Sequence, residues 1–142
     1  MSRIAAWFDC ARPERRLLVA AWLLLLAVWA ALRCMSLPRV QALLHRVSRS
    51  RLAGSAIAAE RLARLVRTAA RCQPWKVSCL ERSLVLQAIL SGSGSPPQLK
   101  IGVRRDGEAL QAHAWVEIEG RPVGEAPDIS EHFQPFSQPL PQ

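Results

Sequence analysis

The sequence lacks any Cys-x-x-Cys pair, although the chain has four cysteines. Closely spaced cysteine pairs are the usual signature of a zinc site, so nothing in the sequence supports a bound metal. A secretory signal is also missing, because no small-residue cleavage site follows the apolar run after Arg15 and Arg16. We therefore expect a cytoplasmic protein without disulfide bonds. The four cysteines are Cys10, Cys34, Cys72 and Cys79.

The length and composition predict one small globular domain. The chain has 142 residues, of which 50% are hydrophobic and 21% charged, a composition typical of a folded rather than a disordered chain. No internal repeat is evident. We expect a lead-in over residues 1–12, a single domain over residues 13–136 and a tail over residues 137–142.

Charge is distributed unevenly along the chain, whose net charge is +8. Residues 39–71 contain eight Arg and one Glu, whereas residues 106–142 contain seven acidic residues and one Arg. The basic half has two interpretations: a solvated surface attracted to the acidic half, or a surface for an acidic peptide, nucleic acid or anionic lipid. Nothing in the sequence except its charge supports a nucleic-acid partner, so we expect none.

An uncharged apolar run, Leu17–Leu32, lies between Arg residues near the start of the chain. It has 16 residues, whereas a membrane-spanning helix usually needs roughly 20 and at least about 17. Two interpretations stay open: a helix buried in the core or against a partner, or a helix in or on a membrane. The short length favours the first.

The pattern of the chain changes from helical to extended at the segment SGSGSPP, residues 91–97. Before it we expect four helices. The first starts at Pro13 and includes Leu17–Leu32, and the second runs from Pro38 to Val47 and is followed by a polar connection, Ser48–Gly54. The third, over 57–71, is amphipathic with an Arg face, and the fourth covers 79–91. After it we expect strands around 99–103, 112–118 and 121–123, with turns at Asp106-Gly107 and Glu119-Gly120 and a polar, Pro-rich, partly irregular tail from Ser130. This order predicts an α+β fold, in which N-terminal helices (13–91) pack on a small antiparallel β-sheet (98–128).

Cys79 has the sequence setting of a reactive thiol. Ser78 and Glu81 have the spacing of a capping box, which places Cys79 at the first position of a helix. The unpaired N–H groups and partial positive charge of a helix start favour a thiolate and can also stabilise an oxyanion. The alternative is a structural cysteine that packs as a small apolar side chain.

His113 is the candidate base. It alternates with apolar residues on a predicted strand and shares one strand face with Trp115 and Glu117. From there it can reach a helix start packed on the sheet and take a proton from a thiol. The alternative is a surface histidine, which is how we interpret His45 and His132. Glu125 or Asp128, just beyond the third strand, can orient the imidazole, and each can instead cap a loop.

Three short motifs resemble those of a known family. Cys79–Leu84 resembles the C-L-x-R-S/A-L motif of lasso peptide leader peptidases, His113–Glu117 resembles their H-A-W-V-E motif, and Gly120–Val123 resembles the turn and strand that follow. The order cysteine on a helix, histidine on a strand, then an acid is also that of transglutaminase-like and papain-like folds.

The resemblance implies a papain-like cysteine peptidase with Cys79 as nucleophile and His113 as base. The family usually has Asp twelve residues after its His, and this chain has Glu125 there, with Asp128 three residues further on. Position therefore slightly favours Glu125 as the acid, and Asp128 stays as the alternative. Gln73 lies six residues before the cysteine, a spacing similar to that of the oxyanion glutamine of papain. Trp75 and Trp115 are the residues expected near the substrate.

The resemblance also implies partners. These are a precursor peptide, a small separate protein that recognises its leader, and a macrolactam synthetase that uses ATP, whereas the peptidase itself needs no cofactor. Leu17–Leu32 has a counterpart in the family, which favours the core interpretation over membrane association. Two further functions remain as alternatives: a transglutaminase-like acyltransferase and a non-catalytic, membrane-associated scaffold protein.

Overall fold

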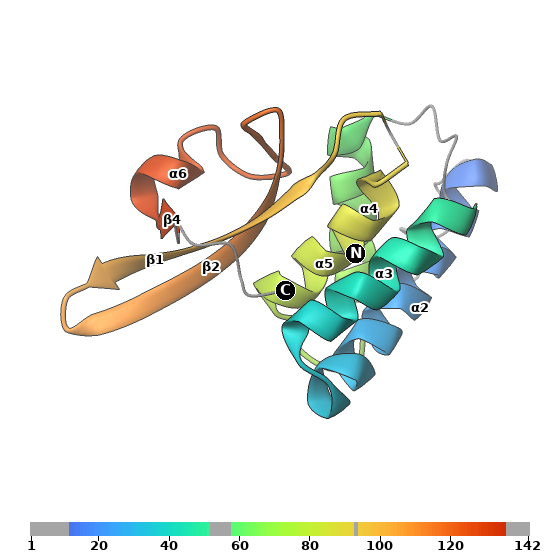
Figure 1. The fold of residues 1–142 in the computed structure, drawn as a ribbon, viewed down its shortest axis with the longest axis horizontal. Coiled ribbons are helices and arrows are strands. Elements are labelled where there is room, and N and C mark those ends of the chain that lie inside the picture. The colour runs from blue at the N-terminus through green and yellow to red at the C-terminus, as the bar shows by residue number, and fades with distance from the viewer. Residues whose placement is uncertain (1–11, 52–57, 93, 136–142) are drawn as a thin grey trace.

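A computed structural model of the chain describes residues 12–51, 58–92 and 94–135. Its elements are α2 (Arg12–Cys34), α3 (Leu37–Arg51), α4 (Ala59–Arg71), α5 (Cys79–Leu90), β1 (Gln98–Asp106), β2 (Ala109–Ile118), β3 (Arg121–Val123), α6 (Ile129–His132) and β4 (Gln134–Pro135). The long helices precede the sheet along the chain, and they lie together at one end of the β1–β2 hairpin (Figure 1). The predicted α+β fold is confirmed.

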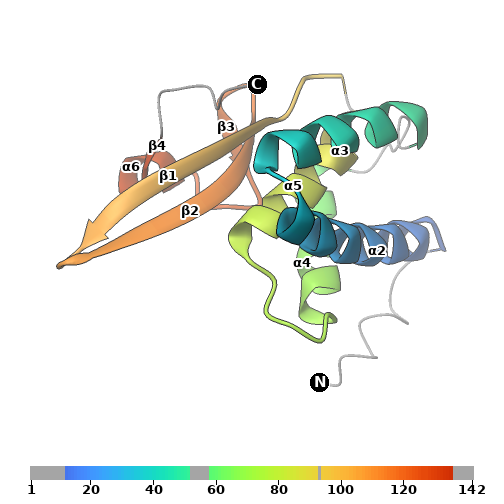
Figure 2. The same ribbon diagram turned by 60° about the horizontal axis from the view of Figure 1, so that its bottom comes forward.

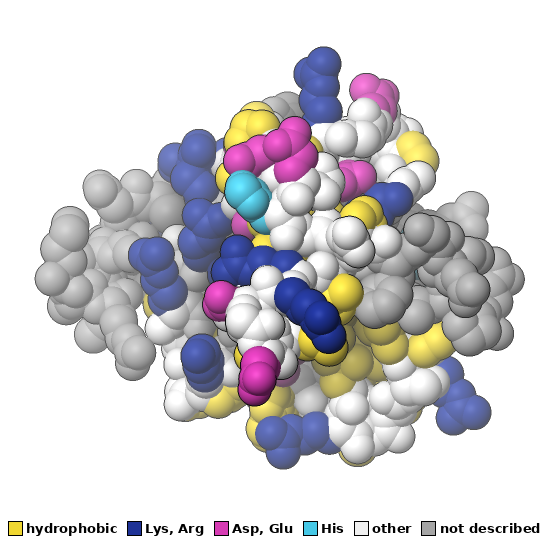
Figure 3. Space-filling model, turned by 90° about the vertical axis from the view of Figure 1, so that its left-hand side faces the viewer, with side chains coloured by type: hydrophobic (Ala, Val, Ile, Leu, Met, Phe, Trp, Pro, Cys, Tyr) yellow, Lys and Arg dark blue, Asp and Glu magenta, His cyan; other side chains and the backbone are white. Residues whose placement is uncertain are grey.

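The sheet has the strand order β3-β2-β1-β4, and every pair of neighbours is antiparallel. The hairpin turns at Asp106-Gly107 as predicted, with Gly107 at a φ of +64° that suits glycine. The far half of the hairpin extends away from the helices (Figure 2). This end of the molecule carries both basic and acidic side chains (Figure 3), so charge on the sheet is mixed rather than uniformly acidic.

Helix α2 packs in the core along one face. Leu18, Leu25 and Val28 are at most 1% exposed and belong to the same hydrophobic cluster as buried residues of α4, α5 and β2. The opposite face of α2 is apolar but open, since Leu23 is 54% exposed. Within the described residues, the stretch Glu14–Cys34 is the one helix long and apolar enough to cross a bilayer, judged by length and composition alone.

One predicted boundary was wrong. Helix α3 does not end at Val47 but continues to Arg51, because Ser48 is buried and its hydroxyl donates to the carbonyl oxygen of Ala88 in α5. The described part of the tail from Ser130 contains regular structure as well, because Gln134–Pro135 pairs with β1 as strand β4. The predicted lead-in, apart from its last residue, and the tail 137–142 lie outside the described residues, as does Cys10.

Candidate active site

Cys79 is the first residue of α5, and the helix start is capped as the sequence predicts. The Glu81 N–H donates to the Ser78 hydroxyl at 3.2 Å, and the Ser78 N–H donates to the Glu81 carboxylate at 2.7 Å. Cys79 is a free, half-buried thiol. Because the two bonds of the capping box fix the backbone on either side of Cys79, the sulfur has a defined position at the N-terminal end of α5.

Ser83 joins α5 to the strand that carries the candidate base. Its hydroxyl donates to the carbonyl oxygen of Ala114 at 2.9 Å in a buried contact. Ser83 lies one helical turn after Cys79, and residues four apart share a helix face. Ala114 directly follows His113 along the chain, so α5 lies against the strand that bears the imidazole, whereas the His113 ring itself packs with Trp115 and Phe133. Within the described part of the chain, no hydrogen bond joins the Cys79 thiol to His113.

Of the two candidate acids, Glu125 is the neighbour of His113. The Glu125 Oε1 atom lies 3.4 Å from Nε2 of His113, and their side chains are 27% and 20% exposed. Asp128 instead lies 2.9 Å from Nε2 of His132, with both side chains more than half exposed. Because Glu125 faces Nε2, the other ring nitrogen of His113, Nδ1, is left to receive a proton.

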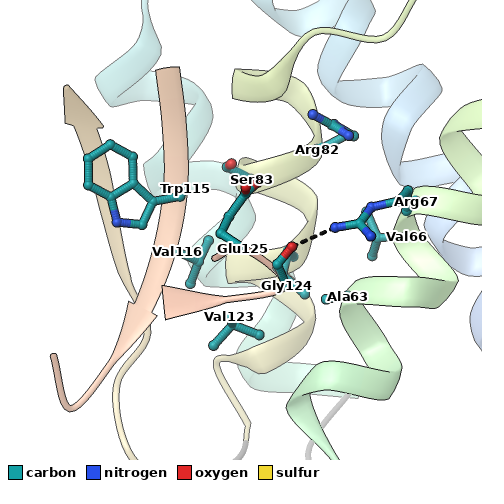
Figure 4. A pocket seen from close by; sticks show the side chains of 11 residues that line it. Ala63, Val66, Arg67, Arg82, Ser83, Trp115, Val116, Val123, Gly124 and Glu125 are labelled. Carbon is teal, nitrogen blue, oxygen red and sulfur yellow. Dashed lines mark hydrogen bonds between the residues drawn. The ribbon is translucent and has the colours of Figure 1, made fainter. Parts of the chain in front are cut away.

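Helix α4 fixes the residue that precedes this acid. The Gly124 N–H donates to the Glu60 carboxylate at 3.0 Å, and the Arg67 guanidinium donates to the Gly124 carbonyl oxygen (Figure 4). Gly124 has a φ of +71°, and a Cβ added there would lie 2.6 Å from the Cβ of Ala63. Only glycine fits this close approach. The contact with α4 therefore fixes the backbone position from which the Glu125 side chain extends. This role of Gly124 was not predicted from the sequence, where its signal is a glycine directly before the acid.

Trp115, expected near the substrate, is a buried core residue that packs against the candidate base. It is 1% exposed, and its indole N–H donates to Glu117 at 2.9 Å. Its ring stacks on His113 with centroids 6.2 Å apart. Phe133, which the sequence analysis did not select, contacts the same imidazole at 5.2 Å. These two rings therefore restrict the orientation of His113.

Gln73 is also placed differently from the oxyanion expectation. It is 3% exposed, and its amide nitrogen donates to the carbonyl oxygen of Trp22 at 2.8 Å. The side chain thus joins α2 to the segment between α4 and α5. Trp75, in the same segment, packs on Trp29 of α2 with ring centroids 4.9 Å apart. Gln73 and Trp75 both line a groove beside the start of α5.

Two hollows flank the candidate triad. The groove has a volume of about 670 Å³ and lies between the end of α4 and the start of α5, with Val77 in its wall two residues before Cys79. The second is a small cavity of about 30 Å³ that Glu125 lines together with residues of α4, α5, β2 and β3 (Figure 4). Arg82 of α5 lines both. Among the described residues, no group of three or more His, Cys, Asp or Glu is arranged to hold a metal ion.

A helix-borne cysteine, followed along the chain by a histidine on an antiparallel sheet, is the arrangement of papain-like thiol enzymes, and the fold has this general form. The family model of the transglutaminase-like superfamily matches residues 21–138, and the chain belongs to this superfamily. Its members are usually enzymes similar to cysteine proteases. Comparisons with curated proteins and with solved structures gave no match.

Proposed function

We propose that the chain is a cysteine peptidase that removes the leader from a ribosomally made precursor during lasso peptide biosynthesis. The observation that carries the proposal is the placement of Cys79 at a capped helix start, which Ser83 holds against the strand bearing His113. The His113–Glu125 pair completes a cysteine–histidine–acid arrangement. The Cys79–Leu84 and His113–Glu117 motifs support the assignment to leader peptidases.

The proposed mechanism uses Cys79, His113 and Glu125. His113 Nδ1 takes the thiol proton, and the sulfur attacks the scissile carbonyl carbon. The resulting oxyanion lies at the start of α5, where the Cys79 N–H points outward. The C–N bond then breaks as His113 protonates the leaving amine, and water hydrolyses the thioester. Glu125 orients the ring and stabilises its protonated form. Substrate binding would draw the thiol and imidazole together, since catalytic hydrogen bonds often tighten only in the complex.

The proposed partners follow from the same resemblance. A separate recognition protein would hold the leader of the precursor, and the peptidase would cut between the leader and the core peptide. The freed N-terminal amine of the core peptide would then be the substrate of a macrolactam synthetase that uses ATP. No resident cofactor is needed for the hydrolysis itself, because the nucleophile, base and acid are all side chains.

The direct test is cleavage of a precursor. The purified chain is incubated with candidate precursor and recognition protein, and the fragments are weighed by mass spectrometry. We expect a leader fragment and a core fragment from the parent chain, none from Cys79→Ala, and unchanged cleavage by Cys34→Ala, which removes an exposed thiol. Cleavage by Cys79→Ala at the parent rate would refute the mechanism.

A transglutaminase-like acyltransferase is the second candidate, and the superfamily match favours keeping it. The two reactions share the thioester and differ in what attacks it. Adding a primary amine such as glycine methyl ester to the same incubation separates them by product mass. A peptidase gives the free acid, whereas an acyltransferase gives the amide at amine concentrations far below that of water.

For location we propose the cytoplasm, with membrane association through Leu17–Leu32 as the alternative. Val19, Leu23 and Leu26 on α2 are all at least 37% exposed, as are Leu43 and Val47 on α3. In the alternative, this apolar surface would touch lipid. Flotation of the chain with anionic phospholipid vesicles would show membrane association, and its absence would leave the cytoplasmic assignment.

A further inference from the structure

The groove beside the start of α5 has walls of one charge sign. Arg67, Arg71, Lys76 and Arg82 all line it, and none of the carboxylates that the structure describes does. In the part of the chain that the structure describes, none of these four side chains forms an ion pair with an acid. Four unneutralised cations around one concave surface produce a positive potential that attracts anionic groups. The groove is therefore suited to a ligand that carries negative charge.

The same walls contain three buried polar atoms that have no hydrogen-bond partner among the described residues. They are Oε1 of Gln73, Nε1 of Trp75 and Nε of Arg82. Gln73 as a whole is 3% exposed. Unpartnered buried polar atoms are rare in folded proteins, and each calls for an explanation. Here one acceptor and two donors are grouped at a single groove.

A peptide backbone supplies both kinds of partner. Its N–H groups can donate to Gln73, and its carbonyl oxygens can accept from Trp75 and Arg82. A small movement of the groove walls on binding would bring these three atoms into contact with the ligand. An inorganic anion without a proton, such as sulfate, would satisfy the cations and the two donors but not the acceptor. The combined pattern therefore favours an extended peptide with acidic side chains.

We propose that this groove is the substrate-binding subsite of the enzyme and that it takes an acidic segment of the peptide on one side of the scissile bond. The groove lies next to the segment that carries the nucleophile, because two of its lining residues, Val77 and Arg82, come shortly before and after Cys79 in the chain. Its role in cleavage rests on the proposed peptidase function, whereas its binding of an acidic peptide does not.

The test is binding of a labelled peptide to the full chain, followed by fluorescence anisotropy. The probes are a fluorescein-labelled peptide of eight glutamates and a matched peptide of eight glutamines. The variants are Arg71→Glu/Lys76→Glu, at exposed residues of the groove, and the matched control Arg39→Glu/Arg46→Glu, at exposed residues of α3 that do not line it. Both pairs change the net charge equally.

We expect the parent chain to bind the glutamate peptide at least about tenfold more tightly than the glutamine peptide in 0.1 M NaCl. The groove variant should weaken glutamate-peptide binding by about tenfold, and the control by less than about twofold. Arg71→Gln/Lys76→Gln should give an intermediate loss and guards against a folding defect of the reversed variant. Equal weakening by the groove and control pairs, or equal affinity for the two peptides, would overturn the proposal.

The outcome is separable from that of the proposed function. Selective binding of the glutamate peptide by a chain that cuts no precursor would leave the groove assignment standing and reject the peptidase. Cleavage of a precursor at the same rate by the parent and the groove variant, with no selective peptide binding, would reject the groove and keep the peptidase.

Discussion

Replacement of Gly124 by alanine should damage both stability and the candidate site, and Gly120 provides a matched control. Both glycines have positive φ angles, +71° and +76°. A Cβ at Gly120 would meet nothing within 4 Å, whereas a Cβ at Gly124 would lie 2.6 Å from that of Ala63 on α4. Both substitutions therefore place an alanine at a strained, positive φ angle, and only Gly124→Ala also creates a steric overlap with α4.

The magnitudes follow from this difference. An alanine in the left-handed region costs about 1–2 kcal/mol, partly offset by the lower entropy of the unfolded chain, so Gly120→Ala should cost about 1 kcal/mol. Carbon atoms pack at about 3.5–4.0 Å, so Gly124→Ala must push the loop from α4 by roughly 1 Å. Overpacking of this kind costs about 1–3 kcal/mol more, which gives a total of about 2–4 kcal/mol. The same displacement would move Glu125 away from His113 and slow cleavage.

The assay is urea unfolding followed by tryptophan fluorescence, since the chain has five tryptophans to report it. The double variant Ala63→Gly/Gly124→Ala removes the colliding carbon and should recover at least about 1 kcal/mol relative to the sum of the single changes. Equal destabilisation by Gly120→Ala and Gly124→Ala, with no such recovery, would show that α4 does not hold the loop as described.

Three further predictions concern the acid, the helix cap and α2. Glu125→Gln should lower the cleavage rate at least about tenfold, and Asp128→Asn should lower it less than about twofold, because only Glu125 faces the imidazole on β2. The reverse ranking in a cleavage assay would assign the acid to Asp128. Ser78→Ala should lower the free energy of unfolding in urea by about 1 kcal/mol. It should also slow the alkylation of the thiol at the start of α5 by iodoacetamide. If neither value changes, Ser78 does not have the capping role. Leu25→Ala should lower the free energy of unfolding by about 2–5 kcal/mol and Leu23→Glu by less than about 0.5 kcal/mol, because Leu25 is 0% and Leu23 54% exposed. Similar losses for the two variants would argue against the packing of α2.

Features that depend on neighbouring residues could be predicted from the sequence. The capping box joins Ser78 to Glu81, three residues apart, and the hairpin turn needs only the pair Asp106-Gly107. Both depend on local backbone geometry, which a short motif specifies. The same holds for the change from helical to extended pattern, which predicted the α+β fold.

Features that depend on distant residues could not be predicted. The position of Glu125 in the motif favoured it over Asp128, but the sequence did not show how the acid is held: Gly124, directly before it, contacts residues of α4 about sixty positions earlier in the chain. Gln73 has the spacing of an oxyanion residue, but a contact with the Trp22 carbonyl on α2 holds its amide nitrogen. No periodic pattern or motif encodes such contacts, because each exists only once the helices and the sheet have packed.

The order of the elements along the chain affects when chemistry can begin during translation. α5, with its thiol, is synthesised and leaves the ribosome before β2 and Glu125 do. Under the proposed function, a growing chain would therefore hold a nucleophile without a base. Activity would start only after the sheet has emerged and closed against α5, so neighbouring nascent polypeptides would be safe from premature cutting.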